Sequence, residues 1–114
     1  MNNIFDELKK KIGGEIIVDD ASLAEYSNDY SIFRIKPQAV VFPKDQEDVA
    51  NLVKWAIDLK KKKRVYMSLT ARSAGTDMSG GPLNDGVIVS FTKHLNRIKE
   101  ITPPSAKASE GTVI

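Results

Sequence analysis

Two short, fully apolar runs constrain the fold of this chain more than any other feature. Residues 39–42 read Ala-Val-Val-Phe and residues 86–89 read Gly-Val-Ile-Val, without a polar residue in either. Apolar runs of this length that do not alternate with polar residues are typical of strands buried on both faces, as in a parallel sheet covered by helices. We therefore expect a central, mostly parallel sheet.

A helix and a further strand are predicted between the two apolar runs. Asp45 is well placed to cap a helix, and Asp48 in the first turn interacts favourably with the helix dipole. Apolar residues recur at helical spacing as far as Ile57, so the helix should continue to about Lys60. Residues 65–69 are expected to form the next strand, and the resulting βαβ unit should have a right-handed crossover.

The N-terminal part, residues 1–36, is interpreted as a helical extension. Apolar residues at helical spacing predict an amphipathic helix over residues 4–12, which Gly13-Gly14 should end. A second short helix is expected over residues 21–26, with Asp20 as its N-cap.

The C-terminal part, residues 37–114, carries the predicted sheet. A third strand is expected at residues 87–91, a short turn after Thr92, and a fourth strand at residues 99–101. The predicted fold class is α/β (α+β), with a small, mostly parallel, three- to four-stranded sheet flanked by helices. Because the sequence stops at Val113-Ile114, where another strand would begin, we expect the first half of a domain, with exposed apolar surface that favours self-association.

Composition excludes several classes of protein. The chain has 17 Lys and Arg against 15 Asp and Glu, and a net charge of +2 is too small to indicate nucleic-acid binding. It has no cysteine, so disulfides, thiolate metal sites and a cysteine nucleophile are absent. The apolar runs are far too short to cross a bilayer, and residues 1–8 lack the pattern of a secretory signal. We expect a cytoplasmic protein without a transmembrane segment.

The segment at residues 69–83, LTARSAGTDMSGGPL, contains the Gly-rich loop (residues 73–81). Its glycines let the backbone approach a ligand closely, and its hydroxyl groups add donors beside exposed N–H groups, which suits phosphate binding. A P-loop is excluded because Gly81-Pro82 stands where Lys and Ser or Thr are required. A dinucleotide fingerprint is disfavoured because the loop leads into a strand rather than a helix.

Short motifs follow one another along the chain in a specific order. They are residues 26–31 (YSNDYS), 37–43 (PQAVVFP), 47–49 (EDV), 72–76 (RSAGT), 79–81 (SGG) and 95–98 (LNRI). Together they resemble the first half of the FAD-binding (PCMH-type) domain of the vanillyl-alcohol oxidase and p-cresol methylhydroxylase flavoprotein superfamily. Within it, the chain is most similar to D-lactate dehydrogenases and the D subunit of glycolate oxidase, and the resemblance covers almost the whole chain.

This resemblance implies an FAD-dependent oxidoreductase that oxidises a D-2-hydroxy acid, such as lactate or glycolate, by hydride transfer to the flavin. Thr76 stands where some relatives attach the flavin covalently through histidine, so noncovalent FAD is expected. The only histidine, His94, is expected to be exposed and not catalytic, and the catalytic residues are expected beyond Ile114. The residues implied to bind the flavin pyrophosphate are Arg72, Ser73, Ala74, Gly75, Thr76, Asp77, Ser79 and Gly80.

Other interpretations remain open. The loop also suits a stand-alone phosphate- or nucleotide-binding module without redox chemistry. The basic run Lys60–Arg64 suits an RNA-interaction domain, although cations after a helix end also complement its dipole and stay solvated. Asp19-Asp20 and Asn28-Asp29 lack the glycine and spacing of a calcium loop, so no metal is expected, and Trp55 is expected to pack in the core.

Overall fold

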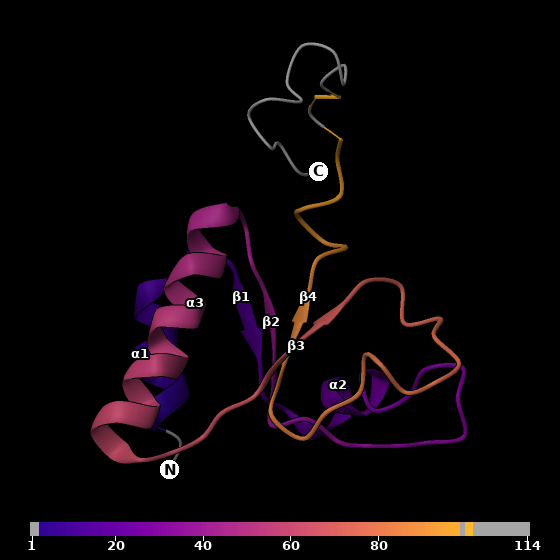
Figure 1. Cartoon of the computed structure of the whole chain (residues 1–114), viewed down its shortest axis with the longest axis horizontal. Coiled ribbons are helices and arrows are strands. Elements are labelled where there is room, and N and C mark those ends of the chain that lie inside the picture. Colours follow the sequence, from indigo (N-terminus) through magenta and orange to yellow (C-terminus); the bar gives the residue numbers. More distant parts are fainter. Residues whose placement is uncertain (1–2, 99, 102–114) are drawn as a thin grey trace, which may run out of the picture.

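The computed structural model describes residues 3–98 and 100–101. Its centre is a four-stranded sheet in the order β1-β2-β4-β3. Strands β2, β4 and β3 are parallel, and β1 pairs antiparallel with β2 at one edge. The predicted mostly parallel sheet flanked by helices is therefore confirmed (Figure 1). The strands are β1 (Glu15–Ile17), β2 (Ala39–Phe42), β3 (Leu69–Arg72) and β4 (Val87–Ser90).

Helices cover both faces of the sheet, which explains why its central strands are uniformly apolar. Alternate residues of β2 enter different cores, because successive side chains of a strand point to opposite faces. Ala39 and Val41 pack in the larger core with α1 and α3, whereas Val40 and Phe42 pack in the smaller core with Leu23 of α2. The helices are α1 (Asn3–Lys11), α2 (Asp20–Glu25), α3 (Gln46–Asp58) and the π-helical turn η1 (Leu59–Lys63).

Trp55 anchors the larger core. Its side chain is almost fully buried, its ring lies 5.8 Å from that of Phe5, and its indole N–H donates to the carbonyl oxygen of Ile4 at 3.0 Å. Trp55 is therefore the packing residue that was expected, and it joins α3 to α1. The N-terminal helix packs into the same core as the sheet, so residues 3–17 are an integral part of this fold.

Two helix boundaries differ from the prediction. The N-cap of α2 is Asp19 and not Asp20, because the Asp19 carboxylate accepts a hydrogen bond from the N–H of Ser22 at 2.9 Å. Asp45 caps α3 as predicted, accepting from the N–H of Asp48. The helical coil then continues past Lys60 as the π-helical turn.

The strand predictions need three corrections. The strand predicted at residues 65–69 begins only at Leu69, since pairing with β4 starts where Leu69 lies beside Val87. Strand β1 was not predicted, because three residues are too few to show a period. The strand predicted at residues 99–101 falls partly outside the described residues, and Glu100 and Ile101 are not in a strand.

Candidate functional site

The Gly-rich loop follows β3 at the carboxyl edge of the parallel strands. In open α/β sheets, this is the edge at which ligands bind, because the loops after neighbouring parallel strands meet there. The segment after β4, beginning at Phe91, lies at the same edge. Figure 1 shows the loop extending away from the sheet alongside the segment that follows α2.

Glycine is required at two positions of the loop by its backbone conformation. Gly75 and Gly80 have φ angles of +75° and +85°, which L-residues with side chains rarely adopt. A Cβ atom on Gly75 would also lie 2.2 Å from Nη2 of Arg72. The loop is therefore packed directly on the Arg72 guanidinium.

The backbone of the loop retains hydrogen-bonding capacity for a ligand. Among the residues that the structure describes, no acceptor receives the N–H groups of residues 74–79. The side chains of Ser73, Thr76 and Ser79 are exposed and add hydroxyl donors. Free backbone amides next to hydroxyl groups, on a loop of small residues, suit an anion with several oxygens, such as a diphosphate.

Arg72 is turned toward the protein and not toward solvent. It is 9% exposed, and its guanidinium donates to the carbonyl oxygens of Asn28 at 2.8 Å and Tyr26 at 3.4 Å. The same group lies over the Tyr26 ring. Burial, with a contribution from Glu25, raises the pKa of Tyr26, while Arg72 opposes this rise. The Arg72 side chain thus supports the loop from the side that faces the protein interior.

Asp77, in the middle of the loop, has an exposed side chain. Its carbonyl oxygen accepts a hydrogen bond from the N–H of Tyr30 at 2.8 Å. Its carboxylate lies against Gly81, where a Cβ atom would be 3.0 Å from Oδ2. The loop is therefore tied to the segment after α2 at Asp77 as well as through Arg72.

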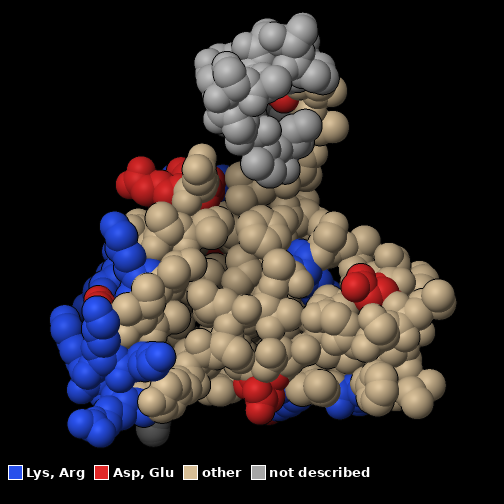
Figure 2. Space-filling model, viewed as in Figure 1, with Lys and Arg blue, Asp and Glu red and all other residues tan. Residues whose placement is uncertain are grey.

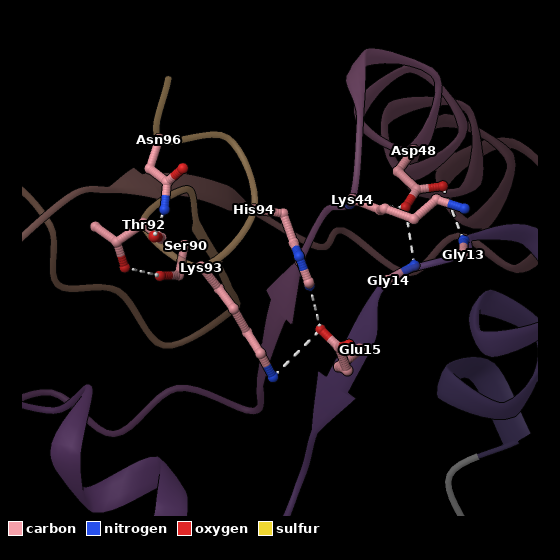
Figure 3. A network of polar contacts seen from close by, with 10 residues as sticks. All are labelled: Gly13, Gly14, Glu15, Lys44, Asp48, Ser90, Thr92, Lys93, His94 and Asn96. Carbon is pink, nitrogen blue, oxygen red and sulfur yellow. Dashed lines mark hydrogen bonds and ion pairs between the residues drawn. The ribbon is translucent and has the colours of Figure 1, made fainter. Parts of the chain in front are cut away.

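His94 lies at the same edge of the sheet and is held by Glu15 (Figure 3). Its Nε2 atom is 2.7 Å from Oε1 of Glu15, and Lys93 approaches the same carboxylate oxygen at 3.5 Å. The hydrogen bond with His94, together with the charges of His94 and Lys93, lowers the pKa of Glu15. The His94 side chain is 28% exposed, so it is less exposed than expected and links the segment after β4 to β1.

Asp48 has a role that the sequence did not reveal. Its carboxylate accepts hydrogen bonds from the N–H groups of Gly13, Gly14 and Lys44 at 2.8 to 2.9 Å (Figure 3). Burial alone would raise the pKa of Asp48, but these bonds and the charge of Lys44 lower it. In the sequence, the Gly13-Gly14 pair was the only signal of this contact. The pair lies too far from Asp48 along the chain for local spacing to connect the two.

The basic run Lys60–Arg64 lies away from the loop. These side chains are exposed, and Figure 2 shows Lys and Arg gathered at the left of the molecule. Lys63 contacts Glu7 at 3.4 Å, and the Lys60 ammonium lies 5.5 Å from the centre of the Tyr66 ring.

A cavity of about 500 Å³ between Lys60, Tyr66 and Asp85 is at the opposite, amino edge of the sheet and includes no residue of the Gly-rich loop. Among the described residues, no group of three or more His, Cys, Asp or Glu is arranged to hold a metal ion.

Comparison with known proteins identifies the class of this domain. Residues 37–114 match the model of the FAD binding domain family. Because this match covers more than half of the chain, the chain belongs to that family. The predicted resemblance to FAD-binding domains is confirmed, whereas the closer likeness to D-lactate dehydrogenases and glycolate oxidase remains a prediction.

Individual relatives are much longer than the chain. It is 35% identical over 102 residues to D-2-hydroxyglutarate dehydrogenase of Escherichia coli (strain K12), covering 89% of this chain and 10% of the relative. It is 38% identical over 88 residues to D-2-hydroxyglutarate dehydrogenase of Pseudomonas putida, covering 77% of this chain and 8% of the relative. The chain thus spans about a tenth of the length of these relatives.

The fold is also similar to that of a solved structure, Physcomitrella patens BBE-like 1 wild-type. The TM-score is 0.58 at 24% sequence identity, over 77% of this chain and 19% of the other. This likeness supports the fold.

Within the described residues, no helix is both long and apolar enough to cross a membrane.

Proposed function

We propose that this chain forms the pyrophosphate-binding part of the FAD site in a flavin-dependent oxidoreductase. The observation that carries the proposal is the set of N–H groups at residues 74–79, which have no acceptor among the described residues and lie at the carboxyl edge of the sheet. Membership of the FAD binding domain family supports FAD as the ligand. The small residues of the loop fit a diphosphate, because they allow it to approach the backbone.

The predicted cofactor-binding residues divide into two groups in this proposal. Ser73, Ala74, Thr76 and Ser79, together with the backbone of Gly75 and Asp77, would contact the diphosphate directly. Arg72 and Gly80 already bond to protein groups and would support the loop. The exposed Asp77 carboxylate can turn toward solvent, which limits its repulsion of an anion.

The proposed substrate is a D-2-hydroxy acid. FAD, when bound, would supply the acceptor for the hydride that leaves the hydroxyl-bearing carbon. The relatives at 35% and 38% identity are named for D-2-hydroxyglutarate, which makes this compound the first to test, before D-lactate and glycolate. Noncovalent FAD remains part of the proposal because Thr76 replaces the histidine used for covalent attachment. A cytoplasmic location, in keeping with the lack of cysteine, also remains part of it.

The test uses the complete gene product. We expect a yellow protein that releases FAD into the supernatant on denaturation, and whose flavin absorbance is bleached anaerobically by one of the three hydroxy acids. The L enantiomers of 2-hydroxyglutarate and lactate serve as matched controls. A colourless protein with no affinity for FAD would contradict the proposal, and flavin retained by the denatured polypeptide would contradict noncovalent attachment.

A further inference from the structure

A side chain outside the Gly-rich loop fixes one end of it. Asp29 follows α2, and its two carboxylate oxygens have different partners. Oδ1 accepts from both the N–H and the hydroxyl group of Ser31, and Oδ2 accepts from the N–H of Gly80 at 3.0 Å. The carboxylate therefore bridges its own turn and the loop, which lies 51 residues further along the chain.

The Gly80 turn is restrained on several sides. Its positive φ angle demands glycine, and a Cβ atom there would lie 3.2 Å from the Phe33 ring. The carbonyl oxygen of Gly80 accepts from the N–H of Leu83 at 3.1 Å. The hydrogen bond that the N–H of Gly80 donates to Asp29 completes these restraints, so the peptide before Gly80 is held in one orientation.

A second bond joins the same two segments. The N–H of Tyr30 donates to the carbonyl oxygen of Asp77 at 2.8 Å. Residues 77–80 are thus attached to residues 29–30 at both ends, while the N–H groups of residues 78 and 79 lie between the attachments with no acceptor among the described residues. Such prior ordering lowers the entropy lost when a ligand binds, and thereby strengthens binding without adding a contact to the ligand.

A carboxylate near an anion site is unfavourable unless other groups satisfy it. Asp29 is partly buried, and its oxygens are satisfied by the donors of Ser31 and Gly80. Both oxygens of the Asp29 carboxylate therefore have hydrogen-bond donors within the protein. This arrangement explains how an acidic residue fits beside a loop that is suited to phosphate.

We propose that Asp29 is a positioning residue for the cofactor site, which orders residues 77–80 so that the neighbouring backbone amides are ready for the diphosphate of FAD. This inference rests on the proposed function. Asp29 acts through the loop and not by contact with the cofactor. Its effect should therefore fall on ligands that carry a phosphate, and not on the flavin ring alone.

The test compares Asp29→Asn with Asp20→Asn in the complete gene product. Asparagine has only one carbonyl oxygen, so it can keep either the Ser31 side or the Gly80 side of the bridge, but not both. Asp20→Asn removes the same charge from an exposed residue whose described partner is Lys36. We expect Asp29→Asn to raise the Kd for FAD and for ADP about tenfold, and to leave the Kd for riboflavin unchanged. Asp20→Asn should change none of the three.

The outcomes separate this inference from the proposed function. If the wild-type protein binds no FAD, the proposed function fails and this inference fails with it. Two results would overturn only the positioning role, provided that the wild type binds FAD. In the first, Asp29→Asn binds FAD as tightly as the wild type does. In the second, Asp29→Asn loses affinity for riboflavin by the same factor as for FAD. Should Asp29→Asn fail to fold, Ser31→Ala provides the second measurement, because it removes the hydroxyl that donates to Oδ1 of Asp29 and accepts from the N–H of Phe33, so that the carboxylate is held less firmly against Gly80. A threefold loss of FAD affinity is then expected, and no loss would overturn the role.

Discussion

Asp48 joins three parts of the chain that are distant in sequence. It lies in the first turn of α3 and is only 5% exposed, and its carboxylate holds the turn between α1 and β1 as well as the residue that follows Pro43. When a buried carboxylate accepts from several backbone N–H groups, the loss of one of its oxygens leaves a buried N–H group without an acceptor, and this destabilises the fold. Its loss should therefore affect stability more than the loss of an exposed charge.

Replacing Asp48 by Asn should destabilise the protein by about 1 to 3 kcal/mol, because the amide NH₂ group would face at least one backbone N–H that now has no acceptor. Urea denaturation gives this difference. Asp45→Asn is the matched control, since it removes a charge from the same helix end but retains a good N-cap, and it should cost less than about 0.5 kcal/mol. Equal effects of the two substitutions would contradict the role of Asp48.

The contribution of Asp48 should also depend on pH. The pKa of Asp48 is lowered in the folded state from its ordinary value of 3.8, so the unfolded chain takes up the proton first as pH falls. The difference in unfolding free energy between wild type and Asp48→Asn should be constant from pH 7 to about pH 5. It should then shrink as the pH falls through 3.8 and below. A difference that grows on acidification would show that another group is responsible.

At the scale of elements, the turn between α1 and β1 permits little change. A Cβ atom on Gly14 would lie 1.9 Å from the carbonyl oxygen of Phe42, whereas a Cβ atom on Gly13 would meet only the flexible end of Lys44 at 2.9 Å. The Phe42 backbone belongs to β2, so only a shift of β1 relative to β2 can relieve the first contact. The flexible Lys44 side chain can simply move.

Gly14→Ala should therefore cost about 1 to 3 kcal/mol of unfolding free energy, and Gly13→Ala less than about 1 kcal/mol. Both are measured by urea denaturation of variants that differ only in the position of one methyl group. A larger loss for Gly13→Ala than for Gly14→Ala would contradict the packing described for this turn.

The sequence predicted the elements that depend on local or strongly apolar patterns. Helix α3 has a cap and a regular apolar face, and β2 and β4 have uninterrupted apolar residues, so all three were predicted nearly in place. The start of β3 was displaced by four residues because its pairing with β4, and not its own composition, sets where it begins. For the candidate site, the sequence indicated the Gly-rich loop, but the hydrogen bonds that join it to Asp29 and Tyr30 span about fifty residues and have no local signal.

At the scale of the whole molecule, the basic side chains gather at one end. Figure 2 shows Lys and Arg mainly at the left of the molecule, whereas the right side is mostly residues of other kinds with one acidic patch. The Gly-rich loop and the segment after α2 that holds it expose several apolar side chains. These form the apolar tip, made of Tyr30, Ile32, Phe33 and Met78, of which Ile32 is 94% exposed and Met78 80% exposed.

We expect this chain to self-associate through the apolar tip at high concentration, because large exposed apolar side chains on neighbouring segments favour protein contacts. Ile32→Lys should reduce the association without lowering stability, since the side chain is almost fully exposed. Sedimentation velocity over a range of concentrations measures this. Ala50→Lys adds the same charge at an exposed position of α3 and should leave association unchanged. Equal association of wild type and Ile32→Lys would show that the tip is not involved.

The two faces of the sheet have cores of unequal size. The smaller one, with Leu23, Val40, Phe42 and Ile88, holds α2, and the segment that restrains the Gly-rich loop follows directly from this helix. Detachment of α2 would require far less apolar surface to be exposed than unfolding of the α1 and α3 side. A cofactor held by the loop could therefore escape through a local fluctuation of one short helix, and its residence time would be set by that fluctuation while the rest of the domain stays intact.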